Sequence, residues 1–288
     1  MVNYAYVKIW GTLVGVVVWN ASRQLADFQY DKKFLEKNWD IAPLKMPIRN
    51  GDRVYSFPEL ISPTDRNEDT FKRLPGLLAD SLPDKYGNQL IEKWLAQNGR
   101  PPNSMNPVEK LCFIGSRGMG ALEFEPAQLK ANKNTFTIAI ENLVESAKKM
   151  LSDRQGFETD ISANEQQAIK EILKIGTSAG GARPKAVIAF NKKTKEVRSG
   201  QTKAPMGFDH WLLKLDGVSG AQVGESHGWG RVEYAYHLMA RECDIDMMEC
   251  ELLEENSRSH FMTKRFDRED GNIKHHIQTL CGIQHFDY

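Results

Sequence analysis

The stretch that decides the fold is IGTSAGGARPK at residues 175–185, followed directly by the apolar run AVIAF at residues 186–190. Three glycines in this stretch have no Cβ atom, so their backbone can approach a phosphate closely. These glycines are Gly176, Gly180 and Gly181. Arg183 and Lys185 add positive charge beside them. The stretch lacks the Gly-Lys-Ser/Thr ending of a Walker A loop, and an ordinary turn before a strand is the alternative interpretation.

A lysine and a glutamate follow this loop in the order that a protein kinase requires. Lys214 lies in the apolar run HWLLKL at residues 210–215, which predicts a strand. Glu233 lies at the start of a predicted helix over residues 232–243. Kinase folds use a strand lysine on the nucleotide phosphates and a helix glutamate that holds this lysine. A lysine that only faces solvent is the alternative interpretation for Lys214.

The remaining pattern predicts an α+β chain in three segments, 1–130, 131–170 and 171–288. The first segment begins with two strands joined near Gly11, and it contains an amphipathic helix over 85–97 that ends at Asn98-Gly99. The second segment is charged and helical in pattern, with helices over 138–151 and 163–175.

The third segment alternates strands with one helix. Apolar residues of the predicted 232–243 helix are expected to pack in the core; they are Tyr236, Leu238, Met239 and Ala240. Further strands are expected over 261–265 and from 274 to 280, on either side of a turn at Asp270-Gly271-Asn272.

Composition indicates a folded chain without a broad nucleic-acid surface. Of the 288 residues, 41% are hydrophobic, and the 38 Lys and Arg balance the 38 Asp and Glu. The four cysteines form no CxxC pair, which favours reduced thiols in a cytoplasmic protein. No run of 18 apolar residues is present, so we expect no membrane span.

Five segments in this order resemble the HipA family of serine/threonine kinases, which are toxins of toxin–antitoxin systems. The segments are GTSAGGARPKA, HWLLKL, RVEYAYHLMA, FMTKRFDRE and HHIQTLCGIQHFDY. LPGLLADSLPDKYG and LCFIGSRGMGALEFEP resemble the N-terminal part of the same family. The resemblance covers nearly the whole chain, and it implies a small β-rich N-terminal subdomain followed by a kinase-like N-lobe of antiparallel sheet and helix.

The resemblance also implies a nucleotide site for ATP with Mg²⁺. Lys214 would contact the nucleotide phosphates, and Glu233 would be its ion-pair partner. The loop residues that would contact the ATP phosphates are Gly180, Gly181, Ala182, Arg183, Pro184 and Lys185. Lys264, Arg265 and Phe266 would form the hinge-like strand along adenine, although Lys264 stands where the family pattern has a glutamate. Ser178 would be the residue that is autophosphorylated, placing about −1.5 to −2 charge beside the phosphate site.

The catalytic groups of the family have no counterpart in this sequence. The family motif Asp-Gly-His-x-Lys-Asn is missing, because the lookalike Asp270-Gly271-Asn272-Ile273-Lys274-His275 lacks the histidine and the asparagine at their motif positions and suits a hairpin turn. We therefore expect the helical C-lobe to be absent, with no catalytic or metal residue in the chain. A metal site made by His275, His276, His285 and Cys281 is disfavoured by their spacing.

These features leave two hypotheses for function. In the first, the chain is a HipA-type kinase polypeptide that is inactive without a separately encoded C-lobe. In the second, it is a non-catalytic module or truncated toxin fragment that binds an antitoxin or a kinase partner. The resemblance implies a HipB-like antitoxin, through which any contact with DNA would be indirect, and a protein substrate that the residues do not identify.

Overall fold

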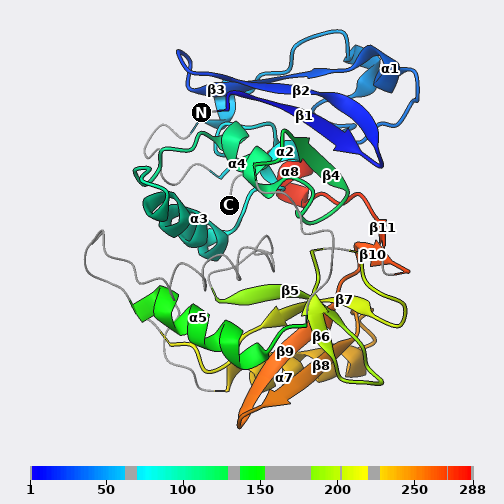
Figure 1. The fold of residues 1–288 in the computed structure, drawn as a ribbon. Coiled ribbons are helices and arrows are strands. Elements are labelled where there is room, and N and C mark those ends of the chain that lie inside the picture. Colours follow the sequence, from blue (N-terminus) through cyan, green and yellow to red (C-terminus); the bar gives the residue numbers. More distant parts are fainter. Residues whose placement is uncertain are drawn as a thin grey trace. The chain divides into compact units, whose positions relative to one another are not determined.

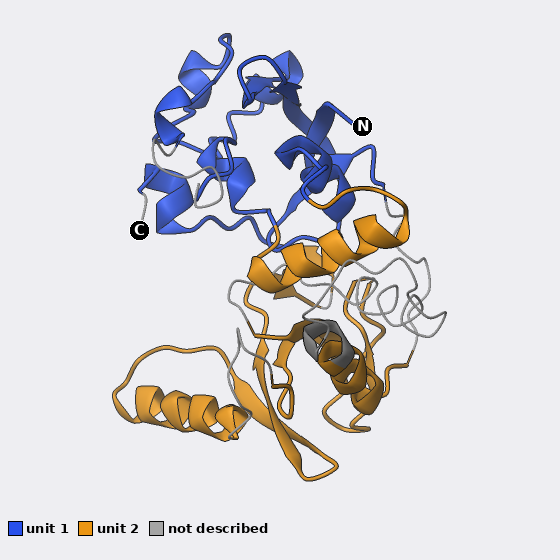
Figure 2. Cartoon of the chain, turned by 90° about the vertical axis from the view of Figure 1, so that its left-hand side faces the viewer, with its two compact units in different colours: residues 1–82, 103–130, 274–288 blue, residues 83–102, 131–273 orange. Residues whose placement is uncertain are grey.

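The computed structural model describes most of the chain, in two compact units (Figure 2). The described residues are 2–61, 70–128, 137–152, 183–201, 203–219, 228–270 and 272–286. Unit 1 consists of residues 1–82, 103–130 and 274–288. Unit 2 consists of residues 83–102 and 131–273.

Unit 1 is built on a four-stranded antiparallel sheet in the order β3-β2-β1-β4 (Figure 1). Its strands are β1 (Tyr4–Ile9), β2 (Thr12–Asn20), β3 (Leu25–Tyr30) and β4 (Leu122–Glu125). Ala5, Val7 and Ile9 are buried while Tyr4 and Tyr6 are exposed, because successive side chains of a strand point to opposite faces. The predicted strand pair around Gly11 is confirmed by the β1–β2 register.

Short helices cover the buried face of this sheet and the loops around it. They are α1 (Lys32–Leu35), η1 (Ile48–Asn50), η2 (Pro58–Leu60), α2 (Gly76–Ala79), α4 (Pro107–Ile114) and α8 (Leu280–Gln284). Helix α4 begins at the Asn106 side chain, which accepts a hydrogen bond from the backbone N–H of Glu109. It packs against β1 and β2, where Val108 and Leu111 join the apolar core.

Unit 2 is built on a five-stranded antiparallel sheet in the order β6-β5-β7-β9-β8. Its strands are β5 (Lys185–Phe190), β6 (Val197–Ser199), β7 (Asp209–Lys214), β8 (Cys250–Glu255) and β9 (Arg258–Lys264). All six residues of β5 are buried, as expected for an apolar run covered on both faces. The mixed architecture with antiparallel sheets agrees with the predicted α+β class.

Three described helices belong to unit 2: α3 (Lys85–Gln97), α5 (Ile140–Ser152) and α7 (Trp229–Glu242). The bounds of α3 are those that the sequence predicts. Helix α7 packs on β8 and β9. Its outer side differs from the prediction, because Tyr236, Leu238 and Met239 are exposed rather than packed in the core.

The two units cut across the three predicted segments. Residues 83–102 belong to unit 2, where Asp84 pairs with Lys185. Residues 274–288 belong to unit 1, where the backbone N–H and the hydroxyl of Thr279 both donate to Asp80 at 2.7 Å. The described part of the expected connector, residues 137–152, is part of unit 2.

The chain after residue 273 also corrects a prediction. Strands β10 (Arg268–Glu269) and β11 (Ile273–Lys274) form a two-stranded sheet, which confirms the hairpin turn between them. The strand expected from 274 to 280 is wrong, since β11 ends at Lys274 and α8 begins at Leu280. The ring of His276 lies 3.2 Å from the carbonyl of Ile41, so this segment bonds to loops of unit 1 instead of a neighbouring strand.

Candidate nucleotide-binding site

The two lysines predicted to serve the nucleotide lie side by side on one face of the unit 2 sheet. In the β5–β7 register, Lys185 stands directly opposite Lys214, and Lys214 stands opposite Phe261 of β9. Directly opposite residues of an antiparallel pair project to the same face. The two lysines nevertheless have different surroundings.

Lys214 is paired with Glu233 across the sheet and helix α7. Its amine donates to Glu233 Oε2, and the two side chains are 33% and 28% exposed. The amine also lies 5.6 Å from the centre of the Phe261 ring. The ion pair therefore holds the amine at the sheet while leaving part of it accessible, an arrangement suited to contact with an anionic ligand.

Lys185 is closed off from solvent by a carboxylate of helix α3. Its Nζ lies 2.5 Å from Asp84 Oδ2, and the two side chains are 1% and 5% exposed. Burial lowers the pKa of Lys185 and raises the pKa of Asp84, while the hydrogen bond between them opposes both effects. The direct phosphate contact that the resemblance implies for Lys185 does not agree with this buried, paired position.

The remaining loop residues divide between described and undescribed positions. Ser178, Gly180, Gly181 and Ala182 lie outside the described residues. The Arg183 guanidinium lies 4.4 Å from the centre of the Trp229 ring, at the first residue of α7. The carbonyl of Pro184 accepts a hydrogen bond from the N–H of Leu215 at 3.0 Å. Arg183 and Pro184 thus join the end of the loop to α7 and to the chain after β7.

The predicted hinge residues have three different environments. The Lys264 amine lies 3.0 Å from Asp209 Oδ2 at the end of β9. Arg265 is buried and bonds through two nitrogens to Asp267, and its backbone N–H donates to the carbonyl of His210. Phe266 is 60% exposed. Of the three, Phe266 alone has a side chain that is open to a planar ligand.

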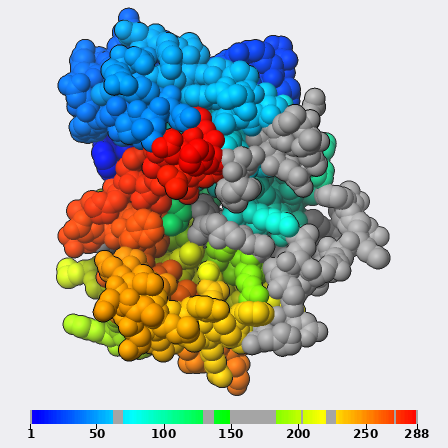
Figure 3. Space-filling view, turned by 180° about the vertical axis from the view of Figure 1, so that it is seen from behind, coloured from blue at the N-terminus to red at the C-terminus, as the bar shows by residue number. Residues whose placement is uncertain are grey.

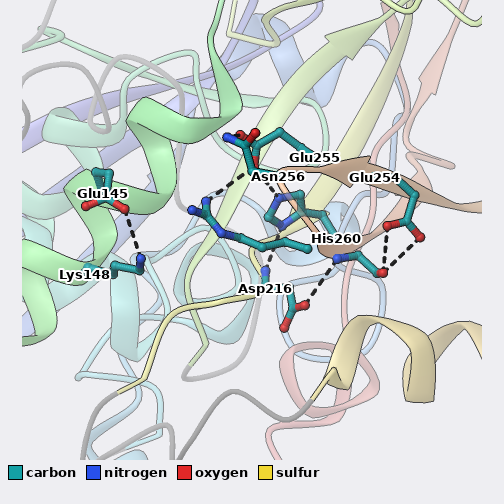
Figure 4. A network of polar contacts seen from close by, with 9 residues as sticks. Glu145, Lys148, Asp216, Glu254, Glu255, Asn256 and His260 are labelled. Carbon is teal, nitrogen blue, oxygen red and sulfur yellow. Dashed lines mark hydrogen bonds and ion pairs between the residues drawn. The ribbon is translucent and has the colours of Figure 1, made fainter.

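A polar network that the sequence did not reveal connects β8, β9 and the chain after β7 (Figure 4), and a further hydrogen bond joins it to α7. The Asp216 N–H donates to His260 Nδ1 at 2.8 Å, and the Ser259 N–H donates to Asp216 Oδ2 at 3.3 Å. The Ser259 hydroxyl accepts from Arg231 of α7 and donates to Glu254. Burial lowers the pKa of His260, so its ring remains neutral and able to accept. The residues bonded in this network lie up to 44 positions apart in the sequence, which is beyond the range of any local pattern.

A glycine sets how closely α7 lies to the sheet. A Cβ atom at Gly230 would lie 1.9 Å from the carbonyl oxygen of Ser259. Gly230 therefore allows the first turn of α7 to contact β9, and Glu233 lies three residues further along the same helix. The sequence shows a glycine at this position, but its neighbours in the sequence do not indicate that it contacts β9.

Asp267 is buried and accepts from Arg265 and Arg268, which supports a structural role after β9. Within the described residues, no three or more His, Cys, Asp or Glu side chains gather as a metal site would require. Among the described helices, none has the length and apolar character needed to cross a membrane.

Comparison with known families identifies the chain. A family model described as the HipA N-terminal domain matches residues 5–125, and one described as the HipA-like C-terminal domain matches residues 177–288. The chain belongs to the HipA family. The HipA-like C-terminal domain therefore covers the segment from which only a nucleotide-binding part was expected.

A solved structure agrees with this assignment. The HipA-family chain is similar to one in the complex of the Shewanella oneidensis MR-1 toxin–antitoxin proteins HipA and HipB with operator DNA, with 16% identity and a TM-score of 0.55. The likeness covers 92% of this chain and 51% of that one, so this chain spans about half the length of the chain it matches. At this identity the likeness shows the fold. No curated protein matches the sequence.

Proposed function

We propose that this HipA-family chain binds ATP on the unit 2 sheet as the nucleotide-binding part of a serine/threonine protein kinase. The observation that carries the proposal is the ion pair between Lys214 of β7 and Glu233 of α7. Kinase folds hold their phosphate-binding lysine with a helix glutamate in this way. Lys214 is the residue to contact the phosphates, and Phe266 is the exposed ring of the expected adenine strand.

Lys214 offers a partly exposed cation for the phosphates of ATP. Among the described residues, no three or more His, Cys, Asp or Glu side chains gather into a complete metal site, but Mg²⁺ beside a nucleotide needs only one or two carboxylates together with the phosphates. The family motif that supplies the groups for the acceptor hydroxyl and for Mg²⁺ has no counterpart in this sequence, which supports the proposal that kinase activity needs a separately encoded helical lobe. Kinase activity of this chain alone is accordingly not expected.

Binding of a fluorescent ATP analogue tests the proposal. A hydrogen bond to a charged group contributes about 1.5–3 kcal/mol, so Lys214→Met is expected to weaken binding about ten- to hundredfold. Lys8→Met is the matched control, because Lys8 is also a strand lysine paired with a glutamate, Glu125 at 2.6 Å, but lies in unit 1. Equal affinity of wild type and Lys214→Met, or no binding by wild type at millimolar ATP, would contradict the proposal.

A second candidate function is that of an interaction module. It rests on exposed apolar side chains of α7, a helix whose residues have the gold colour in Figure 3. They include Trp229, Val232, Tyr236 and Met239. An exposed apolar surface of this kind marks a site for a partner, and a HipB-like antitoxin is the candidate.

The partner hypothesis has its own measurement. Sedimentation of the chain with a HipB-like protein from the same genome is expected to give a complex, and the Tyr236→Ser variant is expected to weaken it. Separate sedimentation of the two wild-type proteins would exclude this antitoxin as the partner. ATP binding by Lys214 is independent of that result.

A further inference from the structure

Two lysines and two carboxylates lie close together at the end of the unit 2 sheet where the nucleotide phosphates are proposed to bind. Lys185 and Lys214 are direct partners in the β5–β7 register, which places opposite side chains about 4.5–5.5 Å apart at Cβ. Each lysine is paired with a carboxylate from a different helix, Lys185 with Asp84 and Lys214 with Glu233. The two ion pairs thus lie next to each other rather than in separate parts of the unit.

The buried lysine is influenced by both carboxylates. Asp84 bonds to Lys185 directly, and Glu233 also stabilises its charge from a greater distance, while Lys214 repels it. An amine that is 1% exposed must keep a carboxylate partner or lose its charge. If Asp84 were neutral, Lys185 would compete with Lys214 for Glu233.

We propose that Asp84 is a positioning residue. Because Asp84 pairs with Lys185, Glu233 remains paired with Lys214 and holds the Lys214 amine in place for a nucleotide phosphate. This inference rests on the proposed ATP site. It assigns Lys185 to the support of the site instead of to contact with the phosphates.

Asp84 also caps helix α3, and the two roles can be separated. Its Oδ1 accepts a hydrogen bond from the Gly87 N–H at 2.7 Å, while Oδ2 receives Lys185. Asparagine caps a helix as well as aspartate does, so Asp84→Asn removes the charge and keeps the cap. Asp31→Asn is the matched control, because Asp31 caps α1 by accepting from the Lys33 N–H in unit 1.

Titration with a fluorescent ATP analogue in the full chain measures the effect. Asp84→Asn is expected to weaken binding about tenfold, and adding Lys185→Met is expected to restore it to within about threefold of wild type. Asp31→Asn is expected to bind as wild type does. If the affinity lost in Asp84→Asn is not restored by adding Lys185→Met, the proposal is overturned. A merely structural role for Asp84, or direct phosphate contact by Lys185, predicts that the double variant binds at least as weakly as Asp84→Asn.

Folding of the variants does not limit the test. The double variant has no buried charge left at this point and is expected to fold, since replacing a buried ion pair by uncharged side chains is often neutral. If circular dichroism shows that Asp84→Asn is unfolded, the affinity of the double variant for the ATP analogue alone tests the proposal. Binding about tenfold weaker than wild type would then contradict the proposal.

A crystal structure of Asp84→Asn without nucleotide separates this inference from the ATP proposal. Glu233 is expected to accept a hydrogen bond from Lys185 in the variant. An unchanged Lys214–Glu233 pair would refute the positioning role, whereas failure of wild type to bind ATP would refute only the proposed function. In that case the crystal structure alone would decide the positioning role.

Discussion

Replacement of Gly230 by alanine tests how helix α7 is held against the sheet. The added Cβ atom would lie 1.9 Å from the Ser259 carbonyl oxygen and 3.0 Å from the Phe261 backbone nitrogen. Real Cβ atoms stay at least 3.0 Å from such atoms, so the first turn of α7 must move away from β9 by about 1.1 Å. Glu233 lies one turn further along and moves with the helix.

Two effects of opposite sign determine the magnitude. Glycine to alanine within a helix ordinarily stabilises a protein by about 1 kcal/mol. Forcing an extra carbon into a packed contact costs about 1–3 kcal/mol, and here the atom met is backbone, which cannot turn aside. Gly230→Ala is therefore expected to lower the free energy of unfolding by roughly 0–2 kcal/mol.

Urea unfolding followed by circular dichroism measures this change, and titration with the ATP analogue measures its effect on Glu233. Ala235→Gly is the control for helix propensity, because Ala235 is exposed on the same helix. It is expected to cost about 1 kcal/mol without changing ATP affinity. A Gly230→Ala variant more stable than wild type would contradict a close contact between α7 and β9.

Two further predictions concern buried charges and a buried ring. Asp267→Ala leaves the buried Arg265 guanidinium unpaired and is expected to cost about 3–5 kcal/mol in thermal unfolding; a change below about 1 kcal/mol would contradict this. Burial lowers the pKa of His285 to about 4 from the ordinary 6.5, so the unfolded chain binds more protons between these values. The free energy of unfolding is expected to fall by about 1–2 kcal/mol as pH drops from 6.5 to 4, a magnitude reduced because His285 is partly exposed. In His285→Gln, the free energy of unfolding is expected to depend less on pH over this range.

Local patterns predicted the elements of this fold well. Apolar runs identified β5 and β7, and amphipathic spacing that ends at Asn98-Gly99 predicted the bounds of α3. The order of Lys214 before Glu233 predicted a pair that the structure brings together. The strands and the helix are determined by neighbouring residues, which is the range over which a sequence pattern determines structure. The pair joins residues 19 positions apart and followed from the order of kinase residues instead.

Contacts between distant segments were not predictable in the same way. Lys185 and Asp84 lie 101 residues apart, and Lys185 alone reads as an exposed cation beside a glycine loop. The segment 274–280 reads as a strand, but its partners are groups from loops of unit 1, such as Asp80. In both cases tertiary hydrogen bonds override what the local sequence favours.

The apolar residues of α7 show how such contacts connect to the site. Gly230 and His237 face the sheet and are buried, whereas Tyr236 and Met239 on the outer side are exposed. Helix α7 is therefore held in unit 2 through its buried side, which faces β8 and β9. Because Glu233 is attached to this helix, a partner that binds the outer side changes the pairing of Lys214 only if it moves α7 relative to β9. The Gly230→Ala variant imposes that movement without a partner, so its ATP affinity gives the sensitivity of the site to any displacement of α7.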